Sequence, residues 1–304
     1  LSRFENLFPI PKGVSYNSYV LLDEKTVLFD TADESISRQY IENVVHALNG
    51  RPLDYMVVQH MEPDHCAALG EVLRRYPEAE VLCSAKAAVM IAQFFAEDFH
   101  ARIRTVKEGE ALETGRHRFR FLMAPMVHWP EVMVAYEDRE KVLFSADGFG
   151  NFGSLTDTDA WADEARRYYG NIVGKYGAQV QALLKKAAAL EIRTICPLHG
   201  PQLSGEVLDR ALTLYGLWAA WKPEQSGVLV AYASFHGHTA EAAKLLAEKD
   251  LLLAGRRGVP IQISPLVVAP AAEHHKKQEQ DHNEQQAAAA ESSVVVAQGG
   301  FQVR

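Results

Sequence analysis

Residues 60–66 read HMEPDHC and place two histidines and two carboxylates within six positions, directly after the apolar run DYMVVQ. A loop that leaves a strand can turn side chains at such close spacings toward one point. Imidazole nitrogens and carboxylate oxygens are both common metal ligands. Four of them in so short a loop exceed what an ordinary surface loop needs, so this stretch predicts a metal site.

Three more residues of ligand type each follow a predicted strand: His128 in APMVHWP, Asp147 in LFSADGFG and His199 in CPLHGP. Taken alone, each is more often a structural or turn residue. Together with the loop they make four histidines and three carboxylates, enough for two metal ions with one carboxylate bridging. Hard carboxylate donors without any thiolate favour iron or manganese over a structural zinc. Zinc hydrolases use similar ligands, so ligand type alone leaves the metal open.

The elements that must position these residues alternate between strands and helices. From 18 to 58, the apolar runs SYVLL, TVLFD and DYMVVQ surround the helical stretch SRQYIENVVHAL, which indicates an α/β domain. Residues 101–145 hold short apolar runs separated by turns, which predict consecutive antiparallel strands. A helical region over 160–190 precedes the strand IRTIC. This order predicts a layered α/β fold with a site on its strand-end loops.

A change in pattern near Lys222, within LYGLWAAWKPEQSG, predicts a boundary between domains at 1–222 and 223–304. Behind it, GVLVAYA, GVPIQISPLV and SSVVVAQGG are predicted strands, and AEAAKLLAEKDLLLAG is a predicted helix. The turn SFHGHT between the first strand and the helix has the shape of a phosphate-binding loop. Hydroxyl groups and backbone N–H groups at the start of a helix can bind an anion without a basic side chain. A plain turn with a helix cap is an equally good interpretation of this turn by itself.

Composition excludes several classes of partner. The formal charge of -8 argues against a nucleic-acid or membrane surface, which prefers basic patches. No apolar run approaches the roughly 20 residues that span a bilayer. Cys66, Cys83 and Cys196 show no CxxC spacing, which argues against a disulfide framework or an iron–sulfur site. Without a recognisable secretion signal at the start of the sequence, we expect a cytoplasmic protein.

The segments HMEPDH, HWPE, FSADGFG and CPLHGP, in this order, resemble the diiron domain of the flavodiiron proteins, or A-type flavoproteins. GVSYNSYVLLDEKTVLFDT, RRYYGNI and the WKP junction add to the resemblance. It implies a metallo-β-lactamase-like αββα sandwich over 1–222, followed by a flavodoxin-like doubly wound domain over 223–304. That second domain is expected to be incomplete, because its three predicted strands fall short of the five or so in flavodoxin-like domains.

The resemblance also implies roles for single residues. The implied ligands are His60, Glu62 and His128 for one iron, Asp64, His65 and His199 for the other, and Asp147 as the bridge. Hydrolases of this fold usually carry a histidine where Glu62 stands, and the anionic donor favours iron. Tyr169, the second tyrosine of YYGN, matches a tyrosine that supports the metal site in the family.

For the second domain, the resemblance implies an FMN phosphate site formed by Ser234, His236, Gly237, His238 and Thr239. The implied activity is reduction of dioxygen to water or of nitric oxide to nitrous oxide, at two iron ions fed by FMN. A rubredoxin-like carrier would donate the electrons. The implied assembly is a head-to-tail homodimer or a dimer of such dimers.

Two other functions remain open at this point. A binuclear hydrolase of the same fold would hold zinc and no flavin, and Glu62 speaks against it. A non-enzymatic electron-transfer or metal-binding module would hold iron without consuming dioxygen, and the short flavin domain keeps that hypothesis open.

Overall fold

The computed structural model describes residues 3–4, 7–153, 155, 161–254, 261–265 and 290–298. Contacts within the chain define two compact units, one of residues 1–221 with 285–304 and one of residues 222–284. None of the helices described has the length and apolar character needed to cross a membrane.

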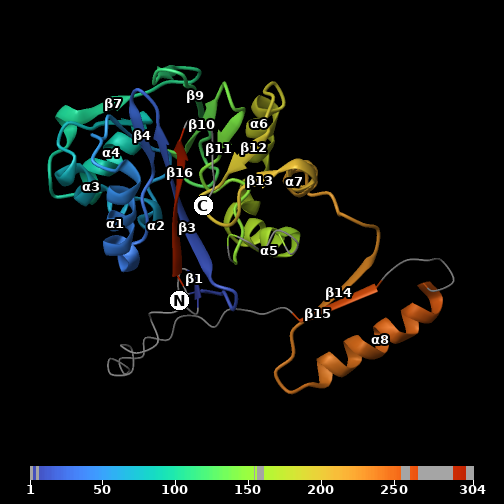
Figure 1. The fold of residues 1–304 in the computed structure, drawn as a ribbon. Coiled ribbons are helices and arrows are strands. Elements are labelled where there is room, and N and C mark those ends of the chain that lie inside the picture. The colour runs from blue at the N-terminus through green and yellow to red at the C-terminus, as the bar shows by residue number, and fades with distance from the viewer. Residues whose placement is uncertain are drawn as a thin grey trace, which may run out of the picture. The chain divides into compact units, whose positions relative to one another are not determined.

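The first unit contains two six-stranded sheets. The first has the order β16-β3-β4-β5-β6-β7, and its strands are β3 (Val14–Leu22), β4 (Thr26–Phe29), β5 (Tyr55–Val58), β6 (Glu80–Cys83), β7 (Ile103–Thr105) and β16 (Ala290–Gln298). Only β3 and β4 pair antiparallel, as a hairpin. The outer face carries α1 (Ser37–Leu48), α2 (Pro63–Cys66), α3 (Leu69–Arg75) and α4 (Ala85–Phe94) (Figure 1).

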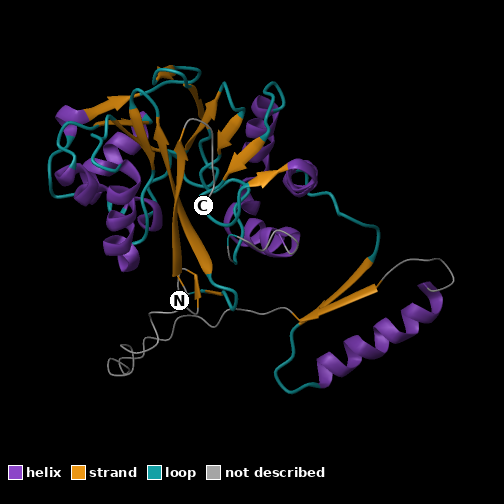
Figure 2. Cartoon of the chain, in the orientation of Figure 1, coloured by secondary structure: helices purple, strands orange, loops and turns teal. Residues whose placement is uncertain are grey.

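The second sheet has the order β13-β12-β11-β10-β9-β8. Its strands are β8 (Ala111–Glu113), β9 (Arg118–Met123), β10 (Met133–Glu137), β11 (Val142–Phe144), β12 (Thr194–Cys196) and β13 (Leu203–Ser204). All its neighbours are antiparallel except β11 and β12. Figure 2 shows helices beside this sheet, namely α5 (Trp161–Tyr168), α6 (Gly177–Ala187) and α7 (Gly205–Ala219).

The two sheets pack face to face through a layer of apolar side chains. Phe29 of β4 stacks on Phe144 of β11 with ring centroids 4.3 Å apart, and Phe119 of β9 joins them. Alternate residues of the same strands, such as Val20 and Leu28, point the other way into the core beneath the helices. This period of two buries both faces of the sheet, and it confirms the expected αββα sandwich.

The predicted strands over 101–145 form as expected, with one difference in pairing. β8 to β11 are antiparallel, but β7 pairs parallel with β6 in the other sheet. Helix α4 provides the crossover connection that a parallel neighbour requires. A smaller antiparallel pair, β1 (Arg3–Phe4) and β2 (Phe8–Pro9), precedes β3.

The second unit contains β14 (Val228–Tyr232), α8 (His238–Ala254) and β15 (Ile261–Pro265). The two strands pair parallel, so this part is one β-α-β unit, the repeating element of a doubly wound fold. We expected SSVVVAQGG to be the third strand here. The structure instead pairs β16 parallel with β3 in the first unit, from Ala290 opposite Val14 to Gln298 opposite Leu22. A β-branched run suits either sheet edge, and its sequence does not specify which. The domain division at 222 stays a prediction.

Candidate metal centre

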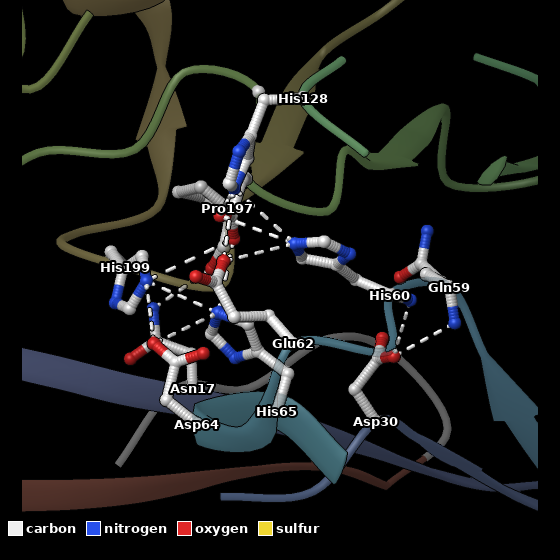
Figure 3. Close-up of polar contacts among 12 residues, drawn as sticks. Asn17, Asp30, Gln59, His60, Glu62, Asp64, His65, His128, Pro197 and His199 are labelled. Atoms are coloured by element: carbon white, nitrogen blue, oxygen red, sulfur yellow. Dashed lines mark hydrogen bonds and ion pairs between the residues drawn. The ribbon is translucent and has the colours of Figure 1, made fainter. Parts of the chain in front are cut away.

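The seven residues predicted as ligands lie together in the first unit, and Figure 3 labels all of them except Asp147. His60 and Glu62 follow β5, and Asp64 and His65 lie in α2, whose first residue is Pro63. Proline suits that position because its fixed φ matches the helix and its missing N–H is not needed there. The other three residues follow β9, β11 and β12, namely His128, Asp147 and His199.

Their ligand atoms form two groups, within each of which all atoms lie within 4.8 Å of one another. In the first group, His60 Nε2 lies 3.3 Å from His128 Nε2. Glu62 Oε2 lies 3.2 Å from the former nitrogen and 3.0 Å from the latter. These three side chains converge on one point from two loops.

The second group has the same form. His65 Nε2 lies 3.1 Å from His199 Nε2. Asp64 Oδ2 lies 3.5 Å from the first of these nitrogens and 3.4 Å from the second. Each group therefore combines two imidazoles with one carboxylate of its own.

Asp147 connects the two groups through its two oxygens. Its Oδ2 lies 3.1 Å from His128 Nε2 and 3.7 Å from His60 Nε2. Its Oδ1 lies 3.0 Å from His65 Nε2 and 3.8 Å from His199 Nε2. One carboxylate with an oxygen on each side is the arrangement that a bridging ligand requires.

The bonding of these atoms fits a pair of cations. Both Asp64 oxygens and Asp147 Oδ1 are buried, and they make no hydrogen bond with the described residues. Buried polar atoms without partners are costly unless something else satisfies them. Two metal ions would neutralise these carboxylates and would be coordinated by the imidazole nitrogens that face them. The ligand role of the seven residues stays a prediction.

Charge within the cluster shifts its acid–base behaviour. Burial by itself raises the pKa of Asp147, but the charge of His65 and a hydrogen bond from His128 hold that pKa well below its usual range. Burial lowers the pKa of His128 and His199. A hydrogen bond to Asp147 raises the pKa of His128 to about 9, and the nearby Asp64 carboxylate raises that of His199 to about 9. The metal-free cluster therefore binds protons, which metal ions must displace.

Sequence reasoning missed two carboxylates that support His60. Glu131 Oε1 lies 2.8 Å from His60 Nδ1 and accepts the Met61 N–H at 2.9 Å. Burial raises the pKa of Glu131, but the hydrogen bond from His60 lowers it below its ordinary value. Asp30 Oδ1 accepts the N–H groups of Gln59 and His60, and burial raises its pKa to about 7. Glu131 is the last letter of HWPE and Asp30 ends the run TVLFD, so both were visible within the motifs already noted.

Polar residues of β3 hold the loop that carries His199. The Asn17 side chain donates to the carbonyls of Pro197 and Gly200 at 2.9 and 2.7 Å. The Ser15 carbonyl lies 2.8 Å from His199 Nδ1, and the Ser15 hydroxyl accepts the Gly200 N–H. The signal for this role was the polar stretch SYNSY in a strand that is otherwise apolar.

The tyrosine prediction needs correction. Tyr168 donates its hydroxyl to Asp147 Oδ2 at 2.8 Å, whereas the Tyr169 hydroxyl has no hydrogen-bond partner among the described residues. Tyr168 shares one helix face with Trp161 and Ala165, which precede it by seven and three residues, and that face is buried. The ring of Tyr169 packs against Tyr215 and Trp218 of α7 instead. The residue that supports the cluster is therefore Tyr168.

The predicted phosphate site lies between β14 and α8 in the second unit. Ser234, His236 and Gly237 lie in the turn, and His238 and Thr239 begin the helix. Gly237 has a φ of +90°, which favours glycine, and its N–H donates to the Ser234 hydroxyl at 3.1 Å. The turn is mostly exposed. Its role in binding FMN stays a prediction.

Known proteins match this chain over the segment that carries the cluster. Residues 14–200 match the family described as ODP family beta lactamase, and this range encloses all seven clustered residues. An anaerobic nitric oxide reductase flavorubredoxin from Aliivibrio salmonicida is 34% identical over 205 residues, covering 64% of this chain and 40% of the relative. A nitric oxide reductase from Moorella thermoacetica is 31% identical over 272 residues, covering 86% of this chain and 66% of the relative. The chain thus spans only part of the length of these curated relatives.

Solved structures agree with the fold. Rubredoxin oxygen:oxidoreductase from the anaerobe Desulfovibrio gigas aligns with a TM-score of 0.77 at 29% identity, covering 87% of this chain and 67% of that one. The flavodiiron protein from Giardia intestinalis aligns with a TM-score of 0.79 at 24% identity, covering 87% of this chain and 65% of that one, which shows the fold alone. With this fold, this cluster and the match over 14–200, the chain belongs to the ODP family beta lactamase group and to the flavodiiron proteins.

Proposed function

We propose that this chain is a flavodiiron oxidoreductase, which reduces dioxygen to water or nitric oxide to nitrous oxide at two non-haem iron ions fed by FMN. The observation that carries the proposal is the position of Asp147, with one carboxylate oxygen in each of two histidine–carboxylate groups. Glu62 in the first group adds an anionic donor where hydrolases of this fold usually have a histidine. That exchange favours iron over zinc.

Each residue of the cluster would have a defined role in holding the metal ions. His60, Glu62 and His128 would hold one iron, Asp64, His65 and His199 the other, and Asp147 both. The iron ions would supply redox chemistry and open coordination positions for a small substrate. Tyr168 would keep the bridging carboxylate in place through its hydrogen bond to Oδ2.

Aromatic side chains around the cluster would keep water away from it. Trp129 packs edge-on against His60 and His128, with ring centroids 5.4 and 6.2 Å away. On the other side, Phe4 and Tyr16 pack edge-on against His199. These apolar ring contacts would suit a small uncharged gas better than the peptide-like or ester substrates of hydrolases.

Electrons would arrive through FMN bound at the turn before α8. The names of two relatives support this class of reaction, since one is a nitric oxide reductase and one a rubredoxin oxygen:oxidoreductase. We propose a rubredoxin-like carrier as the donor, and a head-to-tail homodimer in which the flavin of one copy serves the metal cluster of the other. The choice between dioxygen and nitric oxide is the first outcome to measure.

The experiment loads the purified chain anaerobically with ferrous iron and FMN, reduces it, and follows dioxygen and nitric oxide with electrodes. We expect consumption of at least one gas by the iron-loaded protein and none by the zinc-loaded protein. The variant Glu62→His, which restores the hydrolase-like donor set, is expected to shift metal preference toward zinc. Hydrolysis of a chromogenic ester or β-lactam by the zinc form, with no gas consumption by the iron form, would contradict the proposal.

A further inference from the structure

The outer nitrogens of the clustered histidines have different partners. His60 Nδ1 faces the carboxylate of Glu131 at 2.8 Å, and His199 Nδ1 faces the neutral backbone carbonyl of Ser15 at the same distance. His65 Nδ1 is buried without a hydrogen-bond partner in the part of the chain that is described. The two groups therefore have the same facing ligand atoms, two histidine Nε2 atoms and a carboxylate, but the outer Nδ1 atoms of their histidines have different partners.

Glu131 is built into its position. Its side chain is fully buried, and its backbone carbonyl accepts the Ser84 hydroxyl at 2.7 Å. It follows His128 by three residues in the loop between β9 and β10, so it connects two members of the same group. Oε1 of this buried carboxylate accepts both the Met61 N–H and the His60 ring, and Oε2 has no hydrogen-bond partner among the described residues.

This bonding fixes which nitrogen of His60 carries the proton. Oε1 is already an acceptor for the Met61 N–H, so the His60 ring donates to it from Nδ1. The lone pair is then on Nε2, which points at Glu62 and His128. An anionic acceptor makes the imidazole a stronger metal donor than a neutral carbonyl does.

We propose that Glu131 is a positioning residue that makes the two metal positions unequal. By orienting His60 and increasing its basicity, Glu131 gives the position of His60, Glu62 and His128 the higher metal affinity. The position of Asp64, His65 and His199 has no carboxylate hydrogen-bonded to the outer nitrogen of either histidine in the described structure and is the weaker one. This inference rests on the proposed two-metal function and concerns how its halves differ.

The test uses cobalt(II), whose visible absorption reports coordination, titrated into metal-free protein against a competing chelator. For the wild-type chain we expect two binding steps with distinct dissociation constants. Glu131→Gln keeps the size of the side chain and removes its charge, so it should weaken the tighter step by about 10- to 100-fold. The other step should change by less than about threefold. Mössbauer spectra of iron-57-loaded protein should show a change in one of two quadrupole doublets.

Glu137→Gln is the matched control. Glu137 is also fully buried, its Oε1 lies 3.1 Å from His117 Nδ1, and it accepts backbone N–H groups from Arg139 and Glu140. It should lower stability without changing either cobalt step. If Glu131→Gln does not fold, Glu131→Asp carries the test, because the shortened side chain should still weaken one step selectively.

Equal weakening of both steps, no weakening of either, or the same effect in Glu137→Gln would overturn the inference while leaving the two-metal function intact. A wild-type chain that binds only one ion would overturn the two-metal function, and this inference with it.

Discussion

The loop at 60–66 and the turn at 234–238 both follow a strand and lead into a helix, yet the protein around them differs. The clustered ligands are nearly inaccessible, with at most 8% of any residue exposed. They are held by distant partners such as Glu131, Asn17 and Tyr168. In the turn, Phe235 is 99% exposed, and the hydrogen bond described there joins Gly237 to Ser234.

This difference in burial and support follows from what each site would bind, metal ions in the first and a phosphate group in the second. The carboxylates of such a cluster repel one another, so residues from several strands must hold the cluster in place. A phosphate loop works through its own backbone N–H groups at a helix start. We therefore expect changes in the first unit to alter metal content over a distance, and to leave FMN binding at the turn unchanged.

The largest effect is expected from Asp147→Ala. Removing the carboxylate that contacts both groups should abolish binding of both ions, because each group loses a donor and the charge that balances its histidines. Metal analysis and an FMN titration measure the two sites separately. Asp209→Ala, at an exposed aspartate of α7, is the control. Full metal content in Asp147→Ala would refute the bridging role.

The next effect concerns Gly200, beside His199. Its φ is +82°, and an added Cβ would lie 1.6 Å from Asn151 Oδ1. Gly50 has a similar φ of +80° but open space around it, so Gly50→Ala isolates the backbone cost of about 1–2 kcal/mol. We expect Gly200→Ala to lower the free energy of unfolding by clearly more than Gly50→Ala and to reduce metal content, while Gly50→Ala leaves metal content unchanged. Equal effects of the two variants would show that the contact with Asn151 is unimportant.

A smaller effect is expected from Tyr168→Phe, which removes the hydrogen bond to Asp147 Oδ2. Loss of such an outer partner should lower metal affinity by about 10-fold. Tyr169→Phe should change affinity little, since its hydroxyl has no hydrogen-bond partner among the described residues. Chelator competition with both variants measures the difference. A larger loss in Tyr169→Phe would restore the role first predicted for that residue.

The smallest effect on the metal cluster is expected from Asp23, which follows β3 at the opposite end from Ser15. Burial raises the pKa of Asp23, but hydrogen bonds from the His117 N–H and the Thr114 hydroxyl lower it from 3.8 to about 2. Because the folded-state value is the lower one, this stabilisation is complete above about pH 4 and is lost as the pH falls toward 2.

Asp23→Asn should therefore lower the free energy of unfolding at pH 7 by up to about 2 kcal/mol, and flatten its fall between pH 4 and 2. Metal content at pH 7 should stay that of the wild type. Chemical denaturation at several pH values measures the first effect. A drop in metal content would mean that general destabilisation, and not local contacts, controls the cluster.

The seven clustered residues could be picked out from the sequence because histidines and carboxylates are chemically distinctive and lie in segments that follow strands. Their partners are harder to predict. Glu131 and Asn17 act through contacts with distant residues, such as His60 and Pro197, which are 71 and 180 positions away in the chain. Their local motifs show that they are polar but do not indicate these partners. Tyr168 and Tyr169 are adjacent and both buried, so only the packing against α7 decides which hydroxyl reaches Asp147.

For the fold as well, contacts between distant segments could not be predicted from the sequence. The alternation of apolar residues predicted the strands and a layered α/β fold, since burial on one or two faces leaves a period in the sequence. The αββα sandwich was implied by the resemblance to the flavodiiron proteins. Strand partners leave no such period, which is why the pairing of β7 with β6 and of β16 with β3 differs from expectation.

We propose that histidines and carboxylates of the first unit hold a two-iron cluster. The most direct measurement is metal analysis with Mössbauer spectroscopy of the chain, expressed in iron-57 medium and purified without added metal. We predict about two iron ions per chain, with spectra of an exchange-coupled pair. Zinc at both positions, or a single isolated iron, would contradict the claim.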